Sequence, residues 1–401
     1  MRSSKQNIKI DVFLLGLFLL LWATNAYLIF GNLGKYASLS LGILLIITSL
    51  INIKIDLKTS RIAFISFCIL IFYIILSYLL DQETFNPLII SFDFVNLFLF
   101  VLGLILARRT MHEIKIRKSV IIFISILSIT SGYFYFTNQV SLNYEVGIRG
   151  LGDSNLNAIG VAYVNAQLLI LIIWFLLRKN NVFIKWLLII AAISIIIVLL
   201  ITESRGPILF LVMIFFLVFF KNIFKAFKFR NVLSTFSVLL IILFIISNTP
   251  IIQSKIQSVT KRFSVLFISS SIKNNEDRST TARLDIQSDF FNNYDKMIFG
   301  KYNYAPYPHN QFLEIYMRWG VFGMPILIIS ILSFINAIRF YTRQKENKSS
   351  LNYLLLLLFV YCYLQSMTSL SLDNNRLLWF GFGLFMNNFK LNSHRRFQRT
   401  I

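Results

Sequence analysis

Long apolar runs alternate with short polar segments along most of this 401-residue chain. A helix needs about 20 apolar residues to cross the hydrocarbon core of a membrane, and it satisfies its own backbone hydrogen bonds there. The pattern predicts an all-α, polytopic integral membrane protein with about 12 transmembrane helices. The expected spans cover residues 12–30, 37–53, 62–80, 87–107, 119–136, 158–177, 182–202, 207–220, 231–247, 311–338, 350–370 and 376–390. The tenth is long because we expect it to begin as an interfacial helix.

Composition also favours a membrane protein. Hydrophobic residues make up 57% of the chain and charged residues only 14%, which no soluble domain of this size requires. The first apolar run follows Met1–Lys5 and resembles a signal peptide, but no small-x-small cleavage site clearly follows, so we expect it to be kept as the first helix. Cys68 and Cys362 lie within separate expected helices, and we predict two buried free thiols.

The positive charges fall between the apolar runs. The formal net charge is +22, which in a soluble protein would suggest a nucleic-acid partner. If the N-terminus is cytoplasmic, about two thirds of the 39 Lys and Arg residues lie on the cytoplasmic side, as membrane orientation requires. We therefore predict an even number of spans with both termini in the cytoplasm, and no nucleic-acid partner.

Two outer segments are longer than ordinary connections. One covers residues 137–157 and the other residues 248–308, and loops of this length usually have a function. Within the second, residues 280–296 alternate apolar and polar positions at roughly helical spacing, which predicts an amphipathic helix on the outer surface. The expected segments are helices over 1–247, the large loop over 248–308, and further helices with a basic tail over 309–401.

The most informative stretch joins the large loop to the tenth span. Pro308 favours a helix start, so that His309 would fall in the first turn, followed by Asn310. The other two histidines, His112 and His394, lie among Lys and Arg residues on the expected cytoplasmic side. His309 is therefore the candidate if an imidazole does chemistry, and the alternative is a histidine that caps a helix at the interface.

Three arginines are candidates for binding a phosphate at the outer face, because a guanidinium offers a planar fork of donors and keeps its charge. Arg205 lies in a very short turn between two apolar runs, Arg283 follows two threonines on the expected surface helix, and Arg376 lies in the last outer turn. Each has a simpler alternative. Arg205 would pair with Glu203 or extend its side chain to the interface, Arg283 would be a solvated position, and Arg376 would pair with Asp373.

Aromatic rings precede the histidine. Tyr302, Tyr304 and Tyr307 would suit stacking on sugar faces, although an interfacial aromatic belt is the commoner role for such residues. The sequence holds no metal-ligand spacing, nucleophile motif or phosphate loop, so no metal or other cofactor is expected.

The acidic residues do not support a glycoside hydrolase. The paired acids of a glycoside hydrolase would have to come from the large loop or the start of the tenth span, and no spacing supports them. These acids are Asp285, Asp289, Asp295 and Glu314. Asp93 is the one acid deep in an expected span, where it is either a paired structural residue or part of a substrate path.

Three short motifs follow one another in a fixed order. Ser204-Arg205-Gly206 opens a span, Ala282-Arg283-Leu284 lies in the large loop, and His309-Asn310-x-x-Leu313 is followed by Gly320-x-x-Gly323. In this order, and with a twelve-span layout, the chain resembles the O-antigen polymerase and O-antigen ligase superfamily of bacterial inner-membrane proteins. The combination of motifs carries the resemblance over most of the chain.

The resemblance implies a glycosyltransferase-C-like fold with a large periplasmic loop, in the bacterial inner (cytoplasmic) membrane. It implies an undecaprenyl-pyrophosphate-linked oligosaccharide as substrate, membrane lipid around it, and a chain-length regulator protein as a further partner. By the family's pattern, Arg205 and Arg283 engage the pyrophosphate, His309 acts at the acceptor hydroxyl, and glycosyl transfer needs no metal. The expected substrate-binding set also includes Arg376, Asn310 and Tyr307.

Polymerase and ligase both stay open, because they share the donor and differ in the acceptor, which is another lipid-linked repeat unit or the core sugar of lipid A. The short interval between Arg283 and His309 favours the polymerase, since ligases of this type tend to have a longer one. A flippase or other transporter would be expected to place charges in mid-membrane in both halves. A purely structural scaffold would not explain Arg205 in so apolar a turn.

Overall fold

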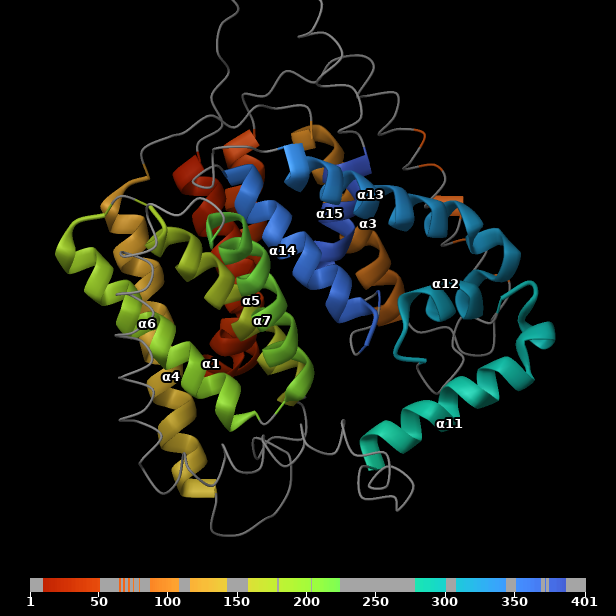
Figure 1. The fold of residues 1–401 in the computed structure, drawn as a ribbon, viewed down its shortest axis with the longest axis horizontal. Helices are drawn as coiled ribbons and strands as arrows, with labels where there is room; N and C mark the ends of the chain where they lie inside the picture. The colour runs from red at the N-terminus through yellow and green to blue at the C-terminus, as the bar shows by residue number, and fades with distance from the viewer. Residues whose placement is uncertain are drawn as a thin grey trace, which may run out of the picture. The chain divides into compact units, whose positions relative to one another are not determined.

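A computed structural model of the chain describes residues 10–50, 87–107, 116–142, 158–178, 180–202, 204–223, 278–300, 308–343, 351–368, 372 and 375–386, with isolated residues between 65 and 79. The regular elements in these ranges are all helical, as the sequence predicts. Within the described ranges, five helical segments are long and apolar enough to cross a membrane. This is therefore a helical protein with several candidate spans (Figure 1). The expected span 231–247 lies outside the described residues, and 62–80 is described only at isolated helical positions.

The described helices belong to two compact units. The first draws on residues 1–53 and 113–269, and the second on residues 54–112 and 270–401. Each unit combines stretches that are distant along the chain. The two units therefore do not coincide with the expected segments 1–247, 248–308 and 309–401.

The first unit begins with α1 (Ile10–Leu50), which folds back on itself at Gly31. Gly31 has φ 65° and ψ −156°, a conformation that is open to glycine and costly for other residues. The two arms pack through Gly16 and Gly42, where a Cβ on Gly16 would meet the Gly42 carbonyl oxygen at 2.8 Å. Small residues permit this close approach of helices. The hairpin therefore accounts for both of the first two expected spans.

The rest of the first unit consists of α4 (Lys118–Leu142), α5 (Ala158–Leu176), α6 (Val182–Ile201) and α7 (Arg205–Ile223). The α4 and α7 helices differ most from the expected spans 119–136 and 207–220. The α4 helix continues past residue 136, because no glycine or proline interrupts it before Leu142. The α7 helix begins at Arg205 and not at residue 207, since the following proline is tolerated in a first helical turn.

A buried polar cluster joins α1, α4 and α5. The carboxamides of Asn25 and Asn165 donate to each other's oxygen, both at 3.1 Å, and the Tyr135 hydroxyl donates to Oδ1 of Asn25 at 3.1 Å. All three side chains are buried. Polar side chains that find partners across helices in this way stabilise packing in an apolar bundle. The cluster was not predicted, because the sequence does not show which asparagines meet.

The second unit contains α3 (Pro87–Ala107), α13 (Met324–Arg343), α14 (Leu351–Ser366) and α15 (Arg376–Met386). The α3 and α15 helices approach backbone to backbone. A Cβ on Gly103 would collide with the Phe380 carbonyl oxygen, and one on Gly383 would collide with the Phe100 carbonyl oxygen. Glycines at the crossing therefore set how close these two helices lie.

The described part of the large loop, residues 278–300, and the tenth expected span also belong to the second unit. A helix, α11 (Arg278–Asn292), and a 3-10 turn, η1 (Tyr294–Met297), occupy the stretch where an amphipathic helix was predicted. The helix is thus confirmed, and its place on the outer surface stays a prediction. The tenth span is divided into α12 (Gln311–Trp319), the 3-10 turn η2 (Gly320–Gly323) and α13. Residues 248–277 and 301–307 of the loop lie outside the described residues.

Of the two cysteines predicted to be buried, the structure confirms one and contradicts the other. Cys362 is buried on α14, but Cys68 is exposed. A residue within an apolar helix can face outward, so membership of an expected span does not by itself imply burial inside the protein.

Candidate functional site

The predicted histidine lies immediately before α12. Asn310 is the N-cap, with its Oδ1 accepting hydrogen bonds from the N–H groups of Phe312 at 2.9 Å and Leu313 at 3.4 Å. His309 therefore precedes the helix, and the expectation that it falls in the first turn is wrong. The reason is that asparagine caps helices better than histidine does, so the helix begins at Gln311.

His309 has an unusual backbone conformation. Its φ is 54°, and among the described residues it is the only non-glycine residue with a positive φ. Asparagine, aspartate and histidine enter this left-handed region more readily than most residues, but it still costs free energy. Such conformations persist where the surroundings impose them, and they cluster at functional sites. The positive φ of the half-buried His309 therefore indicates a backbone conformation that its surroundings impose.

The capping role of Asn310 gives a direct prediction. We expect Asn310→Ala to lower the free energy of unfolding by about 1 kcal/mol, because two backbone N–H groups lose their acceptor. Asn310→Ser should keep most of the stability, since a serine hydroxyl caps almost equally well. Thermal unfolding of the detergent-solubilised protein would measure both variants, and equal destabilisation by serine and alanine would contradict the capping assignment.

The start of α12 is also tied to two neighbouring helices. Gln311 is fully buried, its Nε2 donates to the Ser330 hydroxyl of α13 at 3.1 Å, and its Oε1 accepts from the Ser366 hydroxyl of α14 at 2.6 Å. These bonds fix the residue that directly follows the His309–Asn310 pair. The position of the histidine is therefore set by the helix bundle and not by the loop alone.

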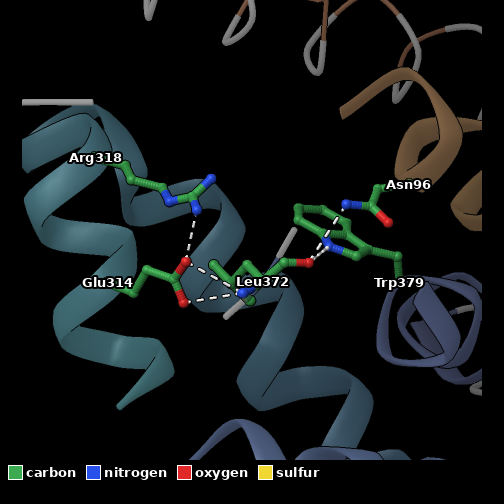
Figure 2. Close-up of polar contacts among 5 residues, drawn as sticks. All are labelled: Asn96, Glu314, Arg318, Leu372 and Trp379. Carbon is green, nitrogen blue, oxygen red and sulfur yellow. Dashed lines mark hydrogen bonds and ion pairs between the residues drawn. The ribbon is translucent and has the colours of Figure 1, made fainter. Parts of the chain in front are cut away.

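One turn further along α12, a buried ion pair binds the backbone of Leu372, which precedes α15. Glu314 and Arg318 are only 3% and 9% exposed, and Oε1 of Glu314 lies 2.7 Å from Nη2 of Arg318. The same carboxylate accepts from the Leu372 N–H at 3.1 and 3.0 Å (Figure 2). A buried charge is tolerated when it is paired and hydrogen-bonded in this manner. Glu314 is thereby engaged in a structural role, unlike a free hydrolytic acid.

The carbonyl of Leu372 completes this network. It accepts from Nε1 of Trp379 on α15 at 2.9 Å and from Nδ2 of Asn96 on α3 at 3.3 Å (Figure 2). The N–H and the C=O of the fully buried Leu372 are thus hydrogen-bonded to side chains from α12, α15 and α3. The network fixes the backbone just before α15, whose first residue is Arg376.

Arg376 lies next to a second fixed residue. Asn375 is buried, and its Nδ2 donates to the Cys362 carbonyl of α14 at 2.8 Å. Arg376 therefore starts α15 directly after the anchored Asn375, in the same unit as His309. Its expected partner Asp373 lies outside the described residues.

The end of the large loop is clasped to α12 by two glycines. Gly300 and Gly320 have φ values of 88° and 55°, and the Val321 N–H donates to the Ile298 carbonyl at 2.8 Å. A Cβ on Gly320 would collide with the Ile298 carbonyl, and one on Gly300 would collide with the Arg318 carbonyl. Only glycine fits at either position, so the backbone of the loop lies directly on the helix.

Because Gly320 is so closely packed in the clasp, adding a single methyl group there should strongly lower the stability of the protein. Gly320→Ala should lower the free energy of unfolding by at least about 2 kcal/mol, because it combines a left-handed φ with a collision. The matched control is Gly160→Ala, where a Cβ would meet nothing within 4 Å. Limited trypsin cleavage after the exposed Lys296 would report opening of the clasp. Equal cleavage of the Gly320→Ala and Gly160→Ala variants would contradict the clasp.

The predicted site residues are distributed over both units. His309, Asn310 and Arg376 belong to the second unit, where the α12 and Leu372 contacts position them. Arg205 is the first residue of α7 in the first unit. Arg283 is on α11, with its side chain outside the described part. Their convergence with Arg205 at one site stays a prediction.

Other predicted residues lie outside the described part of the chain. They are Glu203, Tyr302, Tyr304 and Tyr307, and the side chain of Asp93 on α3. Among the described residues, no three His, Cys, Asp or Glu side chains are arranged to hold a metal ion.

The Glu314–Arg318–Leu372 network was missed by the sequence interpretation. The spacing of Glu314 and Arg318, four residues apart on a short amphipathic helix, was an available signal for an ion pair. No sequence signal indicates that a leucine backbone group would bind the carboxylate, because that contact joins distant segments.

Comparison with known proteins adds no family assignment. No protein-family model matches the chain, and no curated protein sequence matches it.

Proposed function

We propose that this chain is a membrane glycosyltransferase that polymerises a bacterial surface polysaccharide such as O-antigen. It would join undecaprenyl-pyrophosphate-linked oligosaccharide repeat units at the periplasmic face of the inner membrane. The proposal includes about 12 spans, both termini in the cytoplasm, and a site formed by the outer ends of the helices. The observation that carries it is the strained His309, held at the start of α12 in the same framework as Arg376.

The chemistry follows from the residue types. The acceptor hydroxyl oxygen attacks the anomeric carbon of the donor, the bond from that carbon to the pyrophosphate oxygen breaks, and the acceptor proton passes to the imidazole of His309. The departing pyrophosphate gains negative charge. Guanidinium groups of Arg205, Arg283 and Arg376 would stabilise it, because fixed positive charge at the leaving group lowers the barrier. Asn310 and Tyr307 complete the proposed substrate-binding set.

A single displacement makes a stereochemical prediction. The product linkage should have the opposite anomeric configuration from the sugar–pyrophosphate bond of the donor, because the acceptor attacks from the face opposite the leaving group. Nuclear magnetic resonance of polymer made by purified protein from a defined lipid-linked repeat unit would show the configuration. Retention would reject the single displacement with inversion.

The proposed function is tested by the lipopolysaccharide banding pattern of a strain lacking this chain. A polymerase defect leaves a core that bears a single repeat unit. A ligase defect leaves a bare core, with polymer accumulating on undecaprenyl pyrophosphate. Transport of the unmodified lipid-linked unit across vesicles containing the pure protein would instead indicate a flippase. Either of the last two results overturns the polymerase.

A further inference from the structure

An apolar shelf lies where the large loop is clasped to α12. Phe299 is 62% exposed and Phe322 is 41% exposed, and their ring centroids are 6.2 Å apart. Ile298 and Val321, joined by the backbone hydrogen bond of the clasp, are exposed beside them. The shelf therefore consists of Ile298, Phe299, Val321 and Phe322, drawn from two segments of chain.

The fold holds these side chains outward. Gly300 and Gly320 fix the two backbones against each other, so neither segment can turn its aromatic ring inward without breaking the clasp. Phe290, Met297 and Met317 form a separate buried apolar cluster, and Met297 directly precedes Ile298 in the chain. The shelf residues are thus not part of this buried cluster. They form an exposed apolar surface, which usually marks a site that binds a partner or a membrane.

The position of the shelf identifies the occupant. It adjoins Met324, the first residue of α13, and α13 belongs to a candidate membrane span. The shelf continues into a stripe of exposed apolar side chains at helical spacing along α13. These are Met324, Ile328, Ile331, Leu332, Ile335 and Ile338. Such a stripe on a spanning helix faces lipid, and aromatic side chains concentrate where a span enters the headgroup region.

The α11 helix, which precedes the shelf along the chain, has a different character. Asp285 and Asp289 are exposed on it, and Phe290 packs inward onto Met317 and Tyr316 of α12. A helix of this kind suits the membrane surface, with its charged side in water and its end held at the interface.

We infer that the shelf is a membrane anchor, with Phe299 and Phe322 inserted among the lipids at the N-terminal end of α13. The occupant is bilayer lipid. The anchor would hold the end of the large loop at a fixed depth in the membrane interface. This inference does not depend on glycosyl transfer, and its failure would leave the proposed function untouched.

The test places single spin labels on the full-length protein in vesicles of phosphatidylethanolamine and phosphatidylglycerol. Cys68→Ser removes the exposed native thiol, while the buried Cys362 is kept. Labels are placed through Phe299→Cys, Phe322→Cys and Val321→Cys. Asp285→Cys serves as the aqueous control, and Ile331→Cys on α13 serves as the lipid control. All five side chains are exposed, so labelling leaves the core intact.

The measured quantity is the collision rate of each label with oxygen relative to a water-soluble nickel chelate. The ratio at positions 299, 321 and 322 is expected to be several-fold higher than at 285 and to approach that at 331. A ratio as low as that at 285 would overturn the anchor by placing the shelf in water. Protection of the shelf labels from both reagents would overturn it in favour of a protein partner.

Discussion

Replacement of His309 by alanine or asparagine is expected to abolish polymer formation while the amount of protein in the membrane stays normal. Loss of a positioned general base typically lowers a rate by about 10²–10⁴-fold, which is enough to leave a core bearing one repeat unit. Asparagine is the sharper variant, because it tolerates the left-handed φ of 54° at this position. It removes the imidazole without disturbing the start of α12. The lipopolysaccharide banding pattern of a complemented deletion strain is the measurement.

The controls separate chemistry from structure. Arg205→Ala should give the same single-unit pattern at a normal protein level, because it removes charge proposed to stabilise the leaving pyrophosphate. An Asn310→Ser variant, which preserves the helix cap, should keep a normal amount of folded protein. A polymer ladder of unchanged length and amount in His309→Asn would remove the catalytic assignment.

Arg318→Met is expected to cause the largest loss of stability, about 3–5 kcal/mol, because it leaves the buried Glu314 carboxylate without its cation. The effect should extend to function. The carboxylate would no longer be held against the Leu372 N–H, and the backbone that leads to Arg376 would lose its anchor. Thermal unfolding in detergent and the level of membrane-inserted protein would both report the loss.

A matched double variant isolates the ion pair. Glu314→Gln combined with Arg318→Met removes both charges, while the glutamine carbonyl oxygen can still accept from Leu372. It should recover most of the stability lost in Arg318→Met, since replacing a buried pair is far less costly than breaking it. A double variant as unstable as the single one would show that arginine packing, including its contact with the Trp319 ring, is the larger contribution.

Long apolar runs were sufficient to locate most of the helices. The α3 helix begins and ends where the sequence predicts, at residues 87 and 107, because Pro87 opens the run and basic residues follow it. The first two expected spans appear as the two arms of α1, separated by a glycine whose backbone only glycine adopts easily. In such cases the local sequence determines the boundary, since the signals are proline, glycine and charge.

The candidate site was only partly predictable. The sequence singled out His309 and Arg376, but it placed His309 within a helix, because Pro308 is a weaker signal than the cap formed by Asn310. Neither the left-handed φ of His309 nor the clasp formed by Gly300 and Gly320 could be predicted from the sequence. Both depend on tertiary contacts between segments that are distant along the chain.

The central proposal is that Arg205 and His309 act at one face of the membrane, and the accessibility of introduced cysteines tests it most directly. Arg205→Cys and His309→Cys, each in a Cys68→Ser background, would be treated in intact cells with a thiol reagent that crosses the outer membrane but not the inner one. We predict that both positions are labelled from the periplasmic side. Labelling of one position from the periplasm and of the other only after the inner membrane is opened would contradict the shared site.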